Sequence, residues 1–209
     1  MTDFGGSALR GFLDDLASSA PTPGGGTAAA VAGAMGAALA EMVAALTLGR
    51  EKYASSHEAM RPIAEAAAAA RTSLLDLSRQ DSEAFDEVVA ARRLPKTTDE
   101  EKAARDAKIA AANLRAAQVP LETARTAAGL LELIPELAEK GNPNAASDAG
   151  SAALLLEAAV QGALLNVAIN LAGLSDSDLS EEIREEAETL QVDSSRLRDR
   201  ALEIARGRI

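Results

Sequence analysis

The sequence predicts an all-α protein, a single-domain bundle of about six helices, some of them long and kinked by proline. Hydrophobic residues make up 47% of the 209 residues but aromatic residues only 2%, so Ala, Leu, Val and Ile must build the core. Close packing of such small side chains favours helices. Apolar residues recur at helical spacing, and no segment alternates as a strand does. No repeat or linker divides the chain, so we expect one helical domain over residues 1–209.

The helix boundaries follow from capping residues and prolines. Thr98 and Glu101 form a capping box, in which each side chain bonds the backbone N–H of the other residue. Pro62, Pro120 and Pro135 should kink or divide the two longest helical patterns, because proline lacks a backbone N–H. The expected helices cover residues 7–18, 27–48, 56–93, 99–140, 147–172 and 178–206.

Composition excludes several classes of function. The net charge of −11 argues against binding to nucleic acid or to an anionic membrane surface, both of which reward clusters of Lys and Arg. The chain has no cysteine and a single histidine, His57, so neither a thiolate nor a two-histidine metal site can form, and we expect no metal and no cofactor. The lack of cysteine fits a reducing compartment, and residues 1–20 carry no secretory signal. We expect a cytoplasmic protein.

Two segments, residues 27–48 and 151–174, are long and apolar enough to resemble membrane spans. Glu41 lies in the middle of the first, where an acid costs about 2.5 to 3.5 kcal/mol on insertion scales. Glu157 and several amides interrupt the second. We therefore expect two buried helices and no membrane partner.

A run of three glycines, Gly24, Gly25 and Gly26, follows Pro23 and leads into the apolar helix through Thr27. It lacks the Gly-Lys-Ser/Thr ending of a phosphate-binding loop and has no strand before it, as a dinucleotide site requires. Free backbone amides at a helix N-terminus bind anions or polar ligand edges. The glycines are equally well explained by two helices that cross closely, and the residues alone leave both interpretations open.

A second group of polar residues lies in a turn and along the helix after it. One helix cap needs one polar side chain, but this turn has four. Amides that follow Gly162 on one helix face need partners when buried, either on another polar helix or on a ligand. The polar residues of the turn are Asn142, Asn144, Ser147 and Asp148, and those of the helix face are Asn166 and Asn170.

Two further groups of charged residues have an ordinary explanation. Cations beside an aromatic ring after the second expected helix are typical of a solvated helix end, and acids around a phenylalanine on the next helix are typical of a solvated face. The first group is Arg50, Lys52 and Tyr53, and the second is Asp81 and Asp86 around Phe85.

Taken in order, motifs over nearly the whole chain resemble the formimidoyltetrahydrofolate cyclodeaminase family. That family includes the cyclodeaminase domain of formiminotransferase-cyclodeaminase and stand-alone bacterial methenyltetrahydrofolate cyclohydrolases. Each motif is weak alone, but their order along the chain is specific. The motifs are residues 12–13 (FL), 17–19 (ASS), 21–27 (PTPGGGT), 46–53 (LTLGREKY), 119–121 (VPL), 141–144 (GNPN), 147–150 (SDAG) and 166–171 (NVAINL).

The resemblance implies an all-helical homodimer that acts on the one-carbon unit between N5 and N10 of tetrahydrofolate. Two activities fit: the cyclohydrolase opens the 5,10-methenyl form with water to 10-formyltetrahydrofolate, and the cyclodeaminase closes the 5-formimidoyl form with loss of ammonia. Because no formiminotransferase segment accompanies this sequence, we expect the cyclohydrolase. The alternatives from other classes are a non-catalytic folate-binding helical dimer and a purely structural helical oligomer.

Within this resemblance, residue chemistry suggests roles. A carboxylate can stabilise the cationic methenyl carbon and take a proton from water, for which we expect Asp148 first and Asp81 second. Lys52 or Arg50, beside Tyr53, would bind the anionic glutamate tail, although the family often has Lys at positions 50 and 51. The amides and the bare backbone would hold the pterin, and they are Asn142, Asn144, Asn166 and Asn170, Ser147, Gly24 to Gly26, and Thr27.

Overall fold

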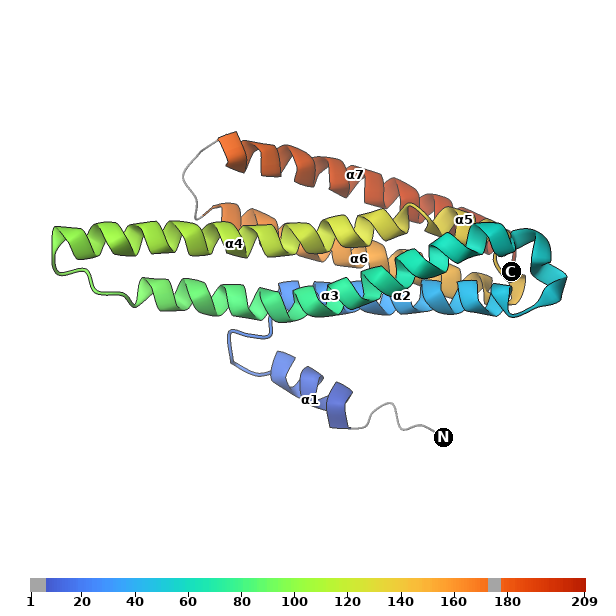
Figure 1. The fold of residues 1–209 in the computed structure, drawn as a ribbon, viewed down its shortest axis with the longest axis horizontal. Helices are drawn as coiled ribbons and strands as arrows, with labels where there is room; N and C mark the ends of the chain where they lie inside the picture. The colour runs from blue at the N-terminus through green and yellow to red at the C-terminus, as the bar shows by residue number, and fades with distance from the viewer. Residues whose placement is uncertain (1–6, 173–177) are drawn as a thin grey trace.

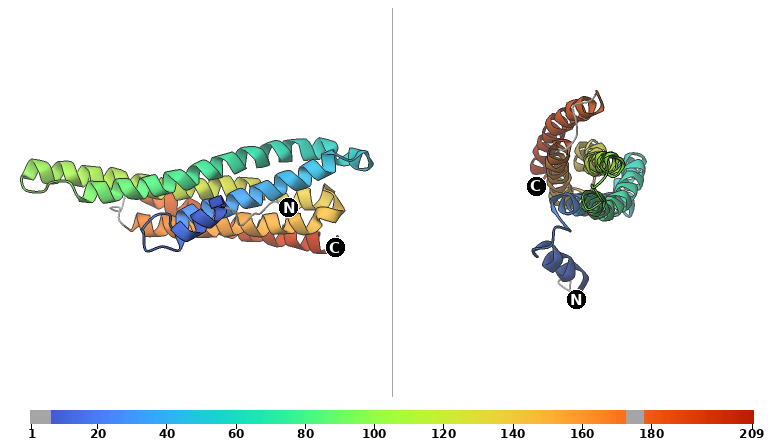
Figure 2. Two further views of the ribbon diagram at one scale, coloured as in Figure 1. Left: turned by 90° about the horizontal axis from the view of Figure 1, so that it is seen from below. Right: turned by 90° about the vertical axis from the view of Figure 1, so that its left-hand side faces the viewer.

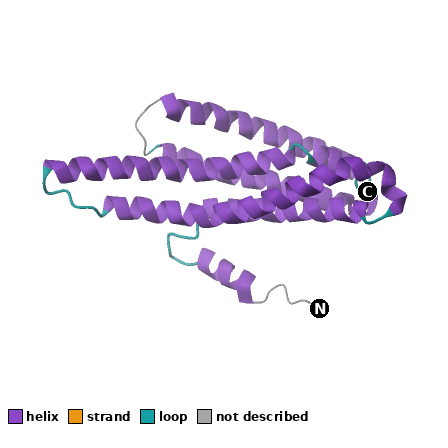
Figure 3. Ribbon diagram, in the orientation of Figure 1, coloured by secondary structure: helices purple, strands orange, loops and turns teal. Residues whose placement is uncertain are grey.

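The chain is all-helical in the computed structural model, which describes residues 7–172 and 178–209 (Figure 3). This confirms the expected fold class. Within the described residues there are seven α-helices and two short 3-10 helices, because the fourth expected helix divides before Pro135. The elements are α1 (Ser7–Leu16), α2 (Gly25–Leu48), η1 (Glu51–Ser56), α3 (His57–Arg92), α4 (Asp99–Leu131), α5 (Ile134–Lys140), η2 (Pro143–Ala145), α6 (Ala146–Leu171) and α7 (Asp178–Arg206).

Local signals set most of these boundaries. The capping box at the start of α4 is formed: the Glu101 amide donates to Thr98 Oγ1 at 3.2 Å, and the Thr98 amide donates to Glu101 Oε2 at 3.2 Å. Pro120 and Pro62 both lie inside helices, so neither ends one. Helix α2 begins at Gly25, two residues earlier than expected, and two of the three glycines therefore belong to its first turn.

Helices α2 and α6 form the centre of the core and run antiparallel. A Cβ added to Gly33 of α2 would lie 3.0 Å from Ala159 Cβ of α6, and one added to Gly162 of α6 would lie 3.2 Å from Ala29 Cβ. Such spacing is tighter than side chains normally allow, so glycine and alanine let these two backbones approach closely. The core around them is largely alanine, leucine and valine, as the composition predicts.

The helices make an elongated bundle (Figures 1 and 2). Helices α3 and α4 pack together as a hairpin that extends past the start of α2, and α7 runs beside α6. The short helix α1 stands away from the bundle, as the end-on view in Figure 2 shows. Helix α2 and the segment Pro143–Leu171 are each long and apolar enough to span a membrane, with 50% and 44% of their apolar windows buried.

Candidate active site

A cleft of about 370 Å³ is lined by the start of α2, the end of α6 and the α3–α4 hairpin. It is the meeting point of the glycine run, an acid from α3 and two amides from α6. Its walls come from four helices that are far apart in the sequence. The lining residues are Pro21, Thr22, Gly24, Gly25, Gly26, Asp81, Phe85, Val88, Val89, Arg92, Asn113, Ala116, Asn166, Ile169 and Asn170.

Asp81 is the half-buried carboxylate of this cleft. Its Oδ2 accepts a hydrogen bond from Thr27 Oγ1 at 2.9 Å, and its carboxylate also accepts from the Thr27 backbone N–H. Gly24 caps α2 without a side-chain hydrogen bond, so Asp81 of a different helix supplies the acceptor at this helix end. Burial raises the pKa of the Asp81 carboxyl above its ordinary value, and the bonds from Thr27 offset only part of that rise.

Gly26 leaves room for the Asp81 carboxylate because it has no side chain. A Cβ at Gly26 would lie 2.7 Å from Asp81 Cγ, 2.8 Å from Oδ2 and closer still to Oδ1. No glycine in the described residues has a positive φ, so the conformational freedom of glycine is not what this turn uses. Close approach is therefore the reason for glycine here, and the approaching group is the protein's own carboxylate.

The side-chain amides of Asn166 and Asn170 on α6 line the same cleft, and the NH₂ group of each is already hydrogen-bonded. Asn166 Nδ2 donates to the Gly162 carbonyl at 2.8 Å, and Asn170 Nδ2 donates to the Ala116 carbonyl of α4 at 2.6 Å. Within the described residues neither Oδ1 accepts a hydrogen bond. The cleft thus presents two amide oxygens, held in place by their own NH₂ groups, to N–H donors of a ligand.

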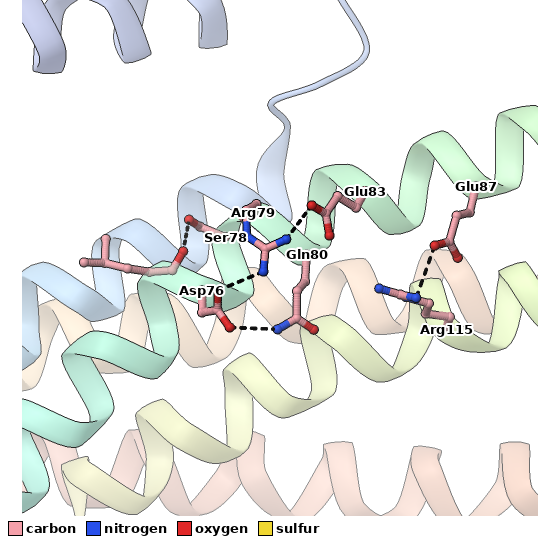
Figure 4. Close-up of polar contacts among 8 residues, drawn as sticks. Asp76, Ser78, Arg79, Gln80, Glu83, Glu87 and Arg115 are labelled. Carbon is pink, nitrogen blue, oxygen red and sulfur yellow. Dashed lines mark hydrogen bonds and ion pairs between the residues drawn. The ribbon is translucent and has the colours of Figure 1, made fainter.

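Two acids near Asp81 on α3, Asp76 and Glu83, both pair with Arg79 on an exposed part of the helix (Figure 4). Arg79 donates to Asp76 at 2.9 Å and to Glu83 at 2.5 Å. Asp81 takes no part in this network and points inward to α2. The expectation of a solvated acidic face is therefore correct for Asp86, which is exposed, but not for Asp81, which is half-buried.

The other end of α2 holds a second polar cluster. We call this end closed because its acceptors, Thr47 Oγ1 and Asn142 Oδ1, already accept hydrogen bonds within the protein. The backbone N–H of Asn142 donates to Thr47 Oγ1 at 2.8 Å, and Tyr53 Oη donates to the side-chain Oδ1 of Asn142 at 2.9 Å. The same Oδ1 accepts a hydrogen bond from the backbone N–H of Asn144 at 3.1 Å. Asn142 is buried and its side-chain oxygen has two donors, so this cluster joins the end of α2 to the turn before α6.

The remaining residues expected at the site lie near that second cluster. Lys52 Nζ stands 4.6 Å from the centre of the Tyr53 ring, a cation–π contact. Arg50 and Ser147 are exposed, and Asp148 is half-buried in the first turn of α6. Within the described residues the Asp148 carboxylate has no hydrogen-bond or ion-pair partner.

Within one chain, these placements separate the expected site residues into two groups. The 24 residues of α2 separate the glycine run from Tyr53 by about 35 Å, and Asp148 lies about 27 Å from Asn166 along α6. Within one chain, Asp81 joins the glycines and the α6 amides, whereas Asp148, Asn142 and the cations do not. The roles themselves stay predictions.

The structure also adds cleft residues that sequence reasoning did not assign to a site. Arg92 and Asn113 line the cleft from α3 and α4, and Phe85 lies with them. Arg92 stands beside Arg93 at a helix C-terminus, where cations ordinarily complement the helix dipole. The available signal was periodicity, since Arg92 falls on the same helix face as Asp81. Among the described residues no group of three His, Cys, Asp or Glu side chains could hold a metal ion.

Comparisons with known proteins identify the family of the chain. A family model for formiminotransferase-cyclodeaminase matches residues 8–189. The chain is 45% identical over 205 residues to methenyltetrahydrofolate cyclohydrolase of Methylorubrum extorquens, covering 98% of this chain and 99% of that protein. It is 38% identical over 187 residues to formimidoyltransferase-cyclodeaminase of Rattus norvegicus, covering 88% of this chain but only 34% of that longer protein.

The fold has a close counterpart among solved structures. The crystal structure of formiminotetrahydrofolate cyclodeaminase from Thermotoga maritima superposes with a TM-score of 0.85 at 36% identity, covering 96% of each chain. A family match over most of the sequence, together with relatives above 30% identity, establishes kinship and not fold alone. The chain belongs to the formiminotransferase-cyclodeaminase family.

Proposed function

We propose that this protein is a one-carbon folate enzyme, a methenyltetrahydrofolate cyclohydrolase that hydrolyses 5,10-methenyltetrahydrofolate to 10-formyltetrahydrofolate. The observation that carries the proposal is the 45% identity to a methenyltetrahydrofolate cyclohydrolase over nearly the full length of both chains. Formimidoyltetrahydrofolate cyclodeaminase is the second candidate, which the Thermotoga maritima structure and the Rattus norvegicus relative favour. Both reactions pass through a tetrahedral carbon that bridges N5 and N10.

Asp81 is our proposal for the acid–base group. Water adds to the cationic methenyl carbon, and the carboxylate takes one of its protons while its charge stabilises the cation. The C–N5 bond then breaks as N5 gains a proton and the carbinol oxygen loses one, which gives the 10-formyl product and one released proton. A carboxyl whose pKa is raised by burial is a stronger base for the first step than an ordinary aspartate.

The α6 amides suit the pterin. Their free Oδ1 atoms would accept hydrogen bonds from the ring and amino N–H groups of a pterin, and the flat backbone of Gly24 and Gly25 lets a planar ring lie close. The prediction that Asp148 is the general base keeps its place as an alternative. The same assay separates the two acids.

The test follows the near-ultraviolet absorbance of methenyltetrahydrofolate with and without the purified protein. We expect the protein to make the absorbance fall much faster than it does in buffer. An unchanged rate would refute the cyclohydrolase proposal. The same preparation is then given 5-formimidoyltetrahydrofolate, and ammonia release there alone would favour the cyclodeaminase. Folate binding without turnover of either compound would identify a non-catalytic binding protein, and no binding at all would leave a structural oligomer.

We also propose that two copies associate through the exposed apolar faces of α2 and α6. Leu165 and Ile169 are 73% and 72% exposed, and Met35 and Met42 are exposed on the neighbouring α2. Light scattering on a sizing column should give twice the chain mass. Leu165→Glu should reduce that mass to one chain, while Val192→Glu, at an equally exposed site on α7, should not. A single-chain mass for the unaltered protein would contradict the homodimer.

The proposal keeps the other sequence expectations: a cytoplasmic enzyme that uses no cofactor and acts on a folate substrate, without a nucleic-acid or membrane partner. The net charge of −11 supports the exclusion of anionic polymers and surfaces.

A further inference from the structure

One face of α3 carries a row of four chemically different side chains along the cleft. Asp81, Phe85, Val88 and Arg92 follow one another at helical spacing, and all four line the cleft. The order is acid, aromatic, aliphatic and cation. From Asp81 to Arg92 the row covers three turns, or roughly 16 Å. The cleft therefore changes character in a fixed direction, from the start of α2 toward the tip of the α3–α4 hairpin.

Arg92 is the uncommitted cation of this row. Its side chain is exposed and, within the described residues, makes no ion pair or hydrogen bond. Its backbone carbonyl accepts from Arg105 Nε at 3.4 Å and Nη2 at 3.3 Å, which holds the end of α3 against α4. Arg115, the nearby cation of α4, is paired with Glu87 at 3.1 Å (Figure 4). A guanidinium without a partner at the rim of a cleft is suited to a ligand carboxylate.

We propose that the cleft binds its substrate in one direction, with the glutamate carboxylates of the folate tail held by Arg92. This inference rests on the proposed function. A methenylfolate presents, in order, a cationic one-carbon centre, a benzoyl ring and a glutamate. These groups match Asp81, then Phe85 with Val88, then Arg92, over a comparable length. The reverse direction would place carboxylates beside Asp81, where like charges repel.

The anchor differs from the one that the sequence suggested. Arg50 and Lys52 lie at the far end of α2, so within one chain neither reaches a tail whose one-carbon unit is at Asp81. A protein with a net charge of −11 repels an anionic tail at long range, so a local cation is required to hold it. Arg92 supplies that charge at the correct end of the molecule.

The experiment compares Arg92→Ala with Arg93→Ala on two substrates, methenyltetrahydrofolate and the corresponding methenyltetrahydropteroate, which lacks glutamate. Arg93 is the matched control because it is the next residue, is also exposed and does not line the cleft. We expect Arg92→Ala to raise KM for the glutamate-bearing substrate about 10-fold, with kcat within 2-fold. KM for the pteroate should not change, and Arg93→Ala should behave as the unaltered protein on both substrates.

An equal rise in KM for both substrates, or no rise for the glutamate-bearing one, would overturn the proposal. Failure of the proposed function looks different, because the unaltered protein would then turn over neither substrate. In that case calorimetric titration with tetrahydrofolate and tetrahydropteroate gives the dissociation constants for the same two variants. Arg92→Ala should still weaken the binding of tetrahydrofolate but not that of tetrahydropteroate. If Arg92→Ala and Arg93→Ala bind tetrahydrofolate with equal affinity, Arg92 is not the anchor.

Discussion

The two ends of α2 hold the same kinds of residue and use them differently. At the C-terminal end, Asn142 is buried, its side-chain oxygen accepts two hydrogen bonds, and Thr47 and Tyr53 close the cluster. At the N-terminal end, Asp81 is half-buried with a raised carboxyl pKa, and the amide oxygens beside it have no partner within the described residues. Polar groups that hydrogen-bond one another stabilise the junction at the C-terminal end, and those without partners at the N-terminal end support our proposal that the cleft binds a ligand.

The largest expected effect comes from Asp81→Asn. The amide can still accept a hydrogen bond from Thr27 but cannot take up a proton, so kcat for methenyltetrahydrofolate should fall by about 100-fold or more. Asp148→Asn, at the closed end of the molecule, should retain most of the activity. The initial-rate absorbance assay measures both, and the opposite ranking would move the general base to Asp148.

A stability measurement provides the control for Asp81→Asn. Because the folded state raises the pKa of this carboxyl, the ionised form costs folding stability above that raised pKa, and the cost disappears as pH falls below the ordinary value near 3.9. The variant should therefore melt at a higher temperature than the unaltered protein at pH 7, with the difference lost in acid. A lower melting temperature at pH 7 would assign Asp81 mainly to capping α2.

Gly26→Ala should have the next largest effect on catalysis. The added methyl group would contact the Asp81 carboxylate at a distance that real side chains do not show, so the acid must move away from α2. We expect kcat to fall roughly 10-fold or more, since displacement of about 1 Å disturbs a positioned group. Gly129→Ala is the matched control, because a methyl group there meets open space, and normal kcat in both variants would disprove the positioning role of Gly26.

At the closed end, Asn142→Ala should cost stability instead of turnover. It removes the acceptor shared by Tyr53 and Asn144, and a buried hydrogen-bond network of this kind contributes about 1 to 3 kcal/mol. Urea unfolding should show that loss, while kcat and KM measured at low temperature stay within 2-fold. Lost activity with unchanged unfolding would return Asn142 to the substrate site.

The smallest effect is expected for Lys52→Ala. Its ammonium group lies over Tyr53 and far from the cleft of its own chain, so KM should change less than 2-fold. Initial rates over a range of substrate concentrations give this value. A severalfold rise in KM would mean that Lys52 of a second copy reaches the cleft, and would join the two ends of α2 across an interface.

Sequence reasoning found the helices better than it found the site. Capping at Thr98, the proline at 135 and the apolar spacing are local, and they placed the helices of the described residues within a few residues of their observed ends. The grouping of the site is not local, because Asp81 meets Thr27 across 54 positions. Helix length was the neglected signal: antiparallel packing brings the end of a long helix to the start of its partner, and so pairs Asn166 with Gly25.

The contact between Asp81 and the start of α2 has a consequence for the turnover cycle. In the proposed reaction the carboxyl gains a proton in one step and must lose it before the next. The hydroxyl and amide of Thr27 favour the ionised form, while burial favours the protonated form. In the proposed reaction the bonds from Thr27 would therefore favour loss of the proton after each turnover, while burial would help the carboxylate to accept that proton in the first place.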